Sequence, residues 1–267
     1  MRKKVTDSPS FLIVDRDRSL VSISGNDRIE FLQGLITNDL LKVDEGIIYT
    51  AILSPQGKYL FDFFIVQNLD QRLFIDIQSN KKNKLLDFLN FYKLNSDVYF
   101  EEVECIVVLG NREIPINALK DPRSNEIGWR LYDLTSDYKC KEFGKDNLEK
   151  IRVSNCIPKT DEELIFQQTY ILETHFEKLN GVDFSKGCYI GQEVTARMKH
   201  KGTLKKLFHP AEFRDLPDKS KSKEVFSEGR VAGEVFSIAY PFCIIKLRQE
   251  FKEKNLTALG SDLKLLS

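Results

Sequence analysis

The segment at residues 186–197 gathers more chemically useful side chains than any other part of the sequence. Cys188 is its central residue, because the thiolate is the reactive form of cysteine, and a cation such as Lys186 and the start of a helix both stabilise it. The alternative is a turn whose cysteine packs inside, since free cysteine is among the most buried residue types. From the residues alone this second interpretation is favoured. The candidate residues of the segment are Lys186, Gly187, Cys188, Tyr189, Gly191, Gln192, Glu193 and Arg197.

The other cysteines and the histidines form no recognisable metal site. The five cysteines are odd in number and include no C-x-x-C pair, which argues against a zinc ribbon or a simple ferredoxin-type cluster site. The three histidines form no H-x-x-x-H pattern, so we expect no permanently bound metal. Unpaired cysteines are typical of a reducing compartment.

The charges of the chain cancel, with 40 basic and 40 acidic side chains among 267 residues. No net charge therefore draws nucleic acid or an anionic membrane surface to the protein. Residues 1–20 contain no long apolar run, which argues against a secretory signal peptide, and no apolar stretch is long enough to span a bilayer. We expect a soluble, cytoplasmic protein that binds neither nucleic acid nor membranes.

The elements that must position the segment begin with a mixture of strands and helices. Apolar residues at helical spacing predict a helix at 27–35, and the Pro55-x-Gly57 turn predicts a hairpin between the strands at 47–53 and 58–66. Because hairpins mix with crossovers, the fold class is α+β. Further strands are predicted at 11–14, 19–23, 73–77, 98–100, 105–109 and 128–134, and further helices at 79–92 and 144–154.

Regular patterns fade between residues 158 and 185, just before the cysteine segment. A loop-rich stretch of this length inside a globular chain is either functional or poorly ordered. It contains His175, for which a structural position is favoured over a catalytic one. After His200, strands at 204–208, 225–226, 230–236 and 242–247 predict a small antiparallel sheet or barrel, so we place a domain boundary between residues 200 and 201.

A family resemblance rests on these residues. Residues 186–193 followed by Arg197 resemble the signature K-G-C-Y-x-G-Q-E-x-x-x-R of the YgfZ family. Residues 31–34 with Thr37 and Asp39 are similar to the family's F-L-Q-G-x-x-T-x-D, and residues 199–202 resemble its basic H-R-G. The resemblance implies an aminomethyltransferase-like fold similar to the glycine-cleavage T-protein. Residues 1–200 would form a folate-binding region of two intertwined, ferredoxin-like α/β subdomains, and residues 201–267 a small antiparallel β-barrel.

The resemblance also implies a function. The family's members are tetrahydrofolate-binding proteins implicated in the assembly or repair of iron–sulfur clusters, which implies folate as a ligand. It also implies transient contacts with iron–sulfur assembly proteins or client enzymes, and we expect a monomer. The alternative is a tetrahydrofolate-dependent aminomethyl transferase, which needs an acid near the reactive nitrogens of folate. Asp76 lies in a predicted strand, but its spacing does not establish that match, so an accessory role without turnover is favoured.

Folate needs a slot for its flat pterin, acceptors for the pterin N–H groups and cations for its glutamate tail. The resemblance makes Glu173 the candidate acceptor for the pterin. Arg152 is a candidate partner for a carboxylate, because guanidinium binds carboxylates in a bidentate way. Thr37 and Asp39 are further polar candidates. Arg197 is either a second carboxylate-binding residue or the i,i+4 partner of Glu193.

The sequence departs from the family at several folate-facing positions. Ser154 stands where relatives carry a glutamate that helps to hold the pterin, and Arg18 and Leu148 stand where some members carry tryptophan. The Cys188 segment, by contrast, is intact. Its thiol could exchange disulfides, contact a cluster or accept a one-carbon unit. Because one cysteine cannot hold an iron–sulfur cluster, a partner or a second cysteine such as Cys156 must supply the other ligands.

Overall fold

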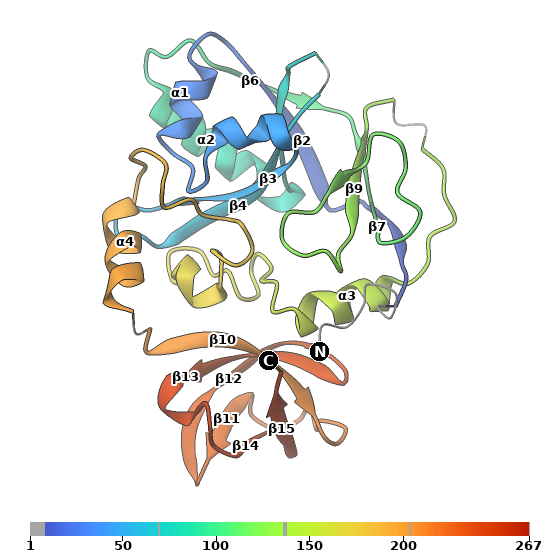
Figure 1. The fold of residues 1–267 in the computed structure, drawn as a ribbon, viewed down its shortest axis with the longest axis vertical. Helices are drawn as coiled ribbons and strands as arrows, with labels where there is room; N and C mark the ends of the chain where they lie inside the picture. The colour runs from blue at the N-terminus through green and yellow to red at the C-terminus, as the bar shows by residue number, and fades with distance from the viewer. Residues whose placement is uncertain (1–8, 69, 136–137, 203, 267) are drawn as a thin grey trace.

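The computed structural model describes residues 9–68, 70–135, 138–202 and 204–266. Its upper part in Figure 1 is built on a five-stranded sheet with the strand order β3-β4-β5-β2-β6, in which every neighbouring pair is antiparallel. The strands are β2 (Arg18–Ser24), β3 (Ile48–Leu53), β4 (Tyr59–Gln67), β5 (Leu73–Gln78) and β6 (Tyr99–Val103).

Both faces of this sheet are buried at β3, where all six side chains are buried and only Thr50 interrupts the apolar run. Successive side chains of a strand point to opposite faces, so Ile48 and Ile52 enter the core formed with α1 (Arg28–Gln33) and α2 (Lys82–Lys93). Tyr49 enters the second core, on the opposite face. The helix predicted at 27–35 is present as α1, but it is shorter and covers only residues 28–33.

A second, four-stranded antiparallel sheet lies beside the first, in the order β1-β7-β9-β8. The chain passes from β1 into β2 of the first sheet and returns from β6 into β7, so the two sheets are intertwined. This sheet contains β1 (Leu12–Asp15), β7 (Ile106–Gly110), β8 (Leu119–Lys120) and β9 (Trp129–Asp133), and α3 (Lys145–Ser154) follows it in the chain.

The loop-rich segment before the signature is part of the core. Leu164, Ile171 and Phe176 are buried in the same core as Tyr49. Its backbone pairs with the sheet, since the Tyr59 N–H donates to the Thr169 carbonyl at 2.9 Å. The short 3-10 helices of the chain are η2 (Leu40–Glu45), η3 (Ser79–Lys81), η4 (Ile171–Thr174) and η5 (Gln249–Phe251).

Six C-terminal strands close into an antiparallel barrel in the order β10-β13-β12-β11-β14-β15, at the lower end of Figure 1. The predicted α+β class with a C-terminal antiparallel barrel is thus confirmed. The last two strands were not predicted, because β14 is too short to show an alternating pattern. The strands are β10 (Lys206–Phe213), β11 (Glu224–Ser227), β12 (Arg230–Ala239), β13 (Phe242–Arg248), β14 (Leu256–Ala258) and β15 (Ser261–Leu265).

The barrel packs on the body through α3. Val153 and Cys156 form a buried cluster with Phe208 of β10 and Ile244 of β13. The proposed domain boundary between residues 200 and 201 falls in the last turn of α4 (Gln192–Lys201) and stays a prediction. Among the described residues, no helix is long and apolar enough to cross a membrane.

Candidate functional site

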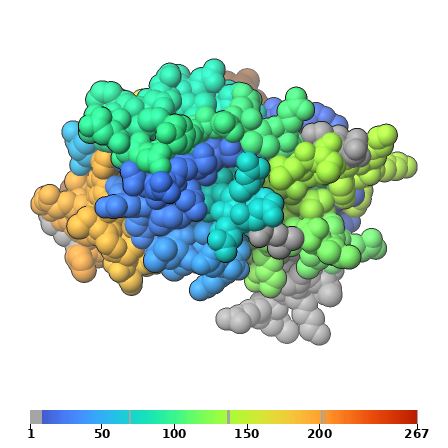
Figure 2. Space-filling model, turned by 90° about the horizontal axis from the view of Figure 1, so that it is seen from above, coloured from blue at the N-terminus to red at the C-terminus, as the bar shows by residue number. Residues whose placement is uncertain are grey.

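Lys186 fixes the start of the signature segment to the first helix. Its side chain is buried, and its ammonium donates to the carbonyl oxygens of Gln33 at 2.8 Å, Ile36 at 2.6 Å and Asn38 at 3.0 Å. Burial lowers the pKa of Lys186 to about 8. Because three carbonyls use its three donors, the lysine positions the loop rather than standing free beside the thiol. Figure 2 shows the orange segment around α4 at the surface beside the blue N-terminal elements.

Thr37 and Asp39 shape the loop that receives Lys186. The Thr37 hydroxyl donates to the Gly181 carbonyl at 2.7 Å and accepts from the Ala51 N–H at 2.9 Å. The Asp39 carboxylate accepts from the Gln33 side chain at 2.8 Å and caps η2. Both polar groups are thus used inside the protein. Their contact with a cofactor stays a prediction.

Cys188 is exposed on a loop that is anchored on both sides. Lys186 and Tyr189 are buried, whereas Gly187 and Cys188 face outward. The Tyr189 hydroxyl is buried without a hydrogen-bond partner among the described residues, and burial raises its pKa to about 12. The packing of these neighbours therefore presents the thiol at the surface, where a partner molecule can reach it.

Gly191 connects this loop to α4. It is the N-cap of the helix, with φ at 83°, in the left-handed region that glycine adopts without strain. A Cβ at this position would lie 2.6 Å from the Ser54 carbonyl oxygen, in the turn between β3 and β4. The signature glycine is thus required both by its backbone angle and by the close approach of the hairpin.

The charged pair of the signature lies on the outside of α4. The Arg197 guanidinium donates to the Glu193 carboxylate at 2.8 Å, and the two side chains are 61% and 85% exposed. The i,i+4 pair considered from the sequence is therefore present. Gln192 begins the helix, and its N–H donates to the Tyr189 carbonyl at 3.2 Å. Its side chain remains a candidate contact.

The other four cysteines are less accessible than Cys188. Cys156 and Cys243 are buried, and Cys105 and Cys140 are half-buried. Burial raises the pKa of Cys105 and Cys243 to about 12, and it raises that of Cys156 further. Cys156 packs between α3 and the barrel, so it does not join Cys188 at a shared site. No group of three or more metal-ligating side chains occurs among the residues that the structure describes.

A cavity of about 170 Å³, which we call the central cavity, lies where the two sheets meet α3 and the segment at 158–160. Arg18 and Leu148, the positions compared with family tryptophans, line it together with Arg152. Gln78 also lines it, and its Oε1 atom is buried without a partner in the described part of the chain. The cavity is therefore a polar pocket with an unused acceptor.

Asp62, which the sequence reading did not single out, also lines this cavity. Its carboxylate accepts hydrogen bonds from the hydroxyls of Tyr49 at 2.8 Å, Tyr59 at 2.7 Å and Thr160 at 2.6 Å. Three donors fix the orientation of the carboxylate and leave one of its lone-pair positions for a ligand. A signal was available, because Asp62 is the only charged residue of the apolar strand β4.

Asp76, the acid weighed for catalysis, lies instead in a buried ion network. Its carboxylate accepts from Arg18 at 2.5 Å, Arg130 at 3.1 Å and the Tyr132 hydroxyl at 2.8 Å. The guanidinium groups of Arg18 and Arg130 also lie over the Phe64 ring, at 5.6 and 3.8 Å from its centroid. The network joins the two sheets, which is a structural use of the carboxylate.

The proposed folate residues do not gather in one pocket. Arg152 lines the central cavity, but its guanidinium is bound by Glu149 at 2.6 Å, Glu163 at 3.2 Å and the Ile157 carbonyl at 2.9 Å. Glu173 pairs with Lys246 of the barrel at 2.6 Å. Thr37 and Asp39 lie beside Lys186, as described above. Direct folate contact by these four residues stays a prediction.

Known proteins are similar to this chain in sequence and architecture, although no family model matches it. It is 30% identical over 223 residues to an iron–sulfur cluster assembly factor IBA57 homolog, mitochondrial, of Mycosarcoma maydis, over 73% of this chain and 55% of that protein. It is 28% identical over 234 residues to the human mitochondrial IBA57, over 74% of this chain and 65% of that protein. The chain is a homologue of the IBA57 iron–sulfur cluster assembly factors. The expected YgfZ-like family is thereby confirmed.

The solved structure of the glycine cleavage system aminomethyltransferase T from Bartonella henselae shares the fold of this chain. The TM-score is 0.72 at 13% identity, over 98% of this chain and 87% of that one. The predicted T-protein-like fold is confirmed, and at this identity the likeness concerns the fold alone.

The chain spans little more than half the length of most of the curated relatives it matches. The relatives are named as mitochondrial, so the expectation of a cytoplasmic location is wrong. That expectation rested on the lack of a secretory signal pattern, which argues against secretion but does not distinguish the cytoplasm from an organelle.

Proposed function

We propose that this protein assists the assembly of iron–sulfur clusters and that Cys188 is the residue that contacts the cluster or its carrier. The observation that carries the proposal is the exposed thiol held between two buried anchors, Lys186 and Tyr189. The buried neighbours restrict the positions that the loop can adopt, and a thiol held by packed residues is better placed for contact with a partner. The names of the IBA57 relatives support the same function.

A single thiolate supplies one ligand, whereas a [2Fe–2S] or [4Fe–4S] cluster needs four protein ligands. The cluster is therefore the cargo of an encounter, and a partner protein provides the remaining ligands. The four other cysteines are buried or half-buried, which supports assigning the encounter to Cys188. We also propose that this encounter takes place in the mitochondrion, because the names of the relatives describe them as mitochondrial.

Tetrahydrofolate is the second part of the proposal, with its pterin head group in the central cavity. The residues fit this group, because Asp62 and the unpartnered Gln78 oxygen are acceptors for its N–H donors and Leu148 supplies an apolar wall. The cavity of about 170 Å³ is smaller than common ligand pockets of about 300–1,000 Å³, so only the head group is assigned to it. When bound, tetrahydrofolate would supply a carrier for one-carbon units.

The cluster function is tested in cells that lack the protein. We expect iron–sulfur enzymes to lose activity there and to recover with the wild-type chain but not with Cys188→Ala. Cys140→Ala is the matched control, because that cysteine is half-buried and outside the signature, and it should rescue fully. Normal iron–sulfur enzymes in the deletion, or full rescue by Cys188→Ala, would count against the proposal.

The folate part is tested separately by calorimetry with reduced folate. Saturable heat is expected for the wild type, with weaker binding in Asp62→Asn, which loses one charged acceptor while keeping the shape. Cys188→Ala should bind folate like the wild type, because the exposed thiol is not among the residues that line the cavity. A flat titration with the wild type would remove folate from the proposal.

A second candidate function, aminomethyl transfer to or from tetrahydrofolate, is favoured by one observation. Asp62 is a carboxylate fixed by three hydroxyl donors at the wall of the cavity, in a fold shared with an aminomethyltransferase. The test incubates the purified protein with tetrahydrofolate and an aminomethyl donor. Methylene-tetrahydrofolate that disappears in Asp62→Asn would establish this activity, and no product from the wild type would exclude it.

A further inference from the structure

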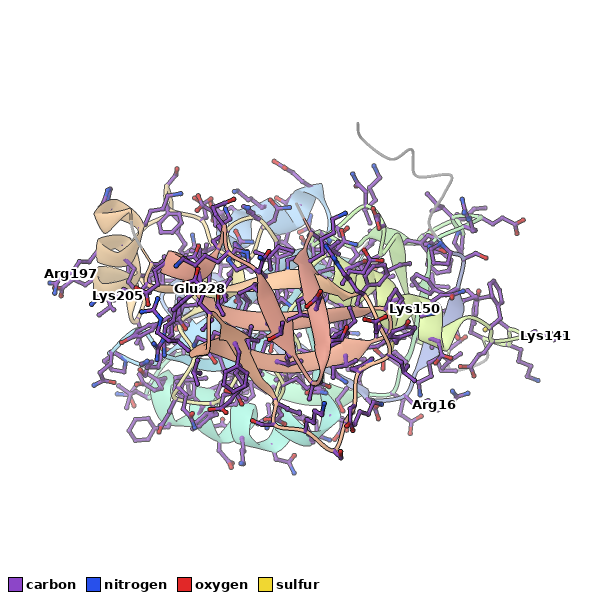
Figure 3. All side chains as sticks on the ribbon, turned by 90° about the horizontal axis from the view of Figure 1, so that it is seen from below. Arg16, Lys141, Lys150, Arg197, Lys205 and Glu228 are labelled. Atoms are coloured by element: carbon purple, nitrogen blue, oxygen red, sulfur yellow. The ribbon has the colours of Figure 1, made fainter. Side chains whose placement is uncertain are left out.

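A second surface site lies at the other end of α4 from Cys188. It is a groove of about 280 Å³ between α4, η4 and β10, which we call the α4 groove. Leu172, Met198, Leu204 and Leu207 supply its apolar lining. Figure 3 shows Lys205, at the start of the barrel, at the same edge of the molecule as Arg197 on α4. None of the signature residues lines this groove.

The surroundings of the α4 groove are positively charged. Lys178 and Lys199 line it, and the Lys199 ammonium is paired with the Glu177 carboxylate at 2.5 Å. Lys178 and the nearby Lys252 are exposed, and neither forms an ion pair within the described residues. His175 also lines the groove. Burial lowers the pKa of His175, and the nearby positive charges of Lys178 and Lys252 lower it further. Lys178 and Lys252 therefore carry charges that no ion pair of the described residues neutralises, although the exposed Glu250 and Glu253 flank Lys252 in the chain.

We propose that the α4 groove docks an acidic segment of the partner protein, with an apolar side chain of that segment as its anchor. The inference rests on the proposed function and names the partner's chemistry. Apolar anchors in pockets carry much of the energy of an interface, and complementary charge selects the partner and speeds its approach. Carboxylates on the segment would pair with Lys178 and Lys252.

The length of α4 sets the distance between the α4 groove and the Cys188 thiol. Its ten residues span about 15 Å, with Cys188 before its first turn and the α4 groove at its last. A partner held in the groove would therefore reach the thiol with a second part of its surface. The volume suits one or two anchor side chains, since small-molecule pockets usually begin near about 300 Å³.

The test uses a short fluorescein-labelled helical peptide that carries leucine on one face and glutamate elsewhere. Anisotropy should show saturable binding that weakens with salt. The double variant Lys178→Glu/Lys252→Glu should bind at least about tenfold more weakly, because two attractive contacts become repulsive. The matched control is Lys141→Glu/Lys150→Glu, with the same change of charge on the opposite side of Figure 3, and it should bind like the wild type.

Several results would overturn this inference. These are no binding to the wild type, equal loss in both double variants, or equal binding of a peptide with lysine in place of every glutamate. A dimer in sedimentation velocity that Lys178→Glu/Lys252→Glu dissociates would assign the groove to a second copy instead. Cys188→Ala should keep peptide binding, so failed rescue with intact binding separates the thiol's function from docking. Peptide binding together with normal iron–sulfur enzymes in the deletion would refute the proposed function alone.

Discussion

Gly57 and Gly191 face each other where the β3–β4 turn meets the start of α4. A Cβ on Gly191 would lie 3.2 Å from the Cα of Gly57, and a Cβ on Gly57 would lie 2.9 Å from the Cβ of Val194. The hairpin of the central sheet thus sets the position of the helix that follows Cys188. The glycines permit a close packing that no side chain at either position would allow.

Gly191→Ala should therefore destabilise the protein by at least about 2 kcal/mol, from the left-handed backbone angle and the overpacked contact with Ser54. Gly187→Ala is the matched control, because a Cβ there meets no atom within 4 Å, and it should change stability by less than about 0.5 kcal/mol. Chemical denaturation measures both. Equal effects of the two substitutions would contradict the packing described for the signature.

Lys186→Met should cost about 2–4 kcal/mol, because it leaves buried carbonyl groups without their donor. The comparison is Lys42→Met, which removes the partner of Asp183 in the same region, at a lysine side chain that is 50% exposed. Such surface pairs contribute below about 1 kcal/mol. Denaturation midpoints and proteolysis of the loop distinguish the two. A loss for Lys42→Met as large as that for Lys186→Met would show that the three carbonyl contacts are not what holds the loop.

Cys188 should react with iodoacetamide before the other four cysteines at neutral pH, as read by mass spectrometry of the alkylated peptides. It is exposed, whereas burial raises the pKa of Cys105 and Cys243 to about 12 and so suppresses their thiolates. Unfolding in denaturant should equalise the rates. If all five cysteines react equally in the folded protein, accessibility does not single out Cys188.

The protein should lose stability as the pH falls from about 6.5 towards 4. Burial lowers the pKa of His209 to about 4 and also lowers that of His175. The unfolded chain therefore binds more protons in this range, so acid favours unfolding, by about 1–2 kcal/mol for His209 between pH 7 and 5. The neutral His209 Nε2 accepts a hydrogen bond from the Gln249 amide at 2.9 Å. Protonation of His209 turns this acceptor into a donor, so the two N–H groups face each other and the hydrogen bond is lost.

Denaturant titrations at pH 7 and 5 measure this effect. His209→Gln should reduce the difference between the two pH values, and His200→Gln, at an exposed position on α4, is the control. The same pH difference in wild type and His209→Gln would show that other groups cause the acid sensitivity.

Local patterns in the sequence were enough to predict most elements of the fold. The apolar spacing from Ile29 to Leu35 predicted α1, and the Pro55-x-Gly57 turn predicted the β3–β4 hairpin. Each of these signals is contained in a few neighbouring residues, so it can be recognised without the tertiary structure. The helix start that was expected after Cys188 is also present, as the beginning of α4. Strands β14 and β15 were not predicted, since short strands owe their position to neighbours far along the chain.

The candidate site divides in the same way. The sequence alone determined the composition of the cysteine segment and its family resemblance, which a linear order of residues can carry. Only the tertiary structure decided that Lys186 binds the carbonyls of Gln33, Ile36 and Asn38, that Cys188 faces outward, and that Asp62 meets three hydroxyls. These contacts join residues far apart in the chain, and their geometry depends on packing that no local pattern encodes.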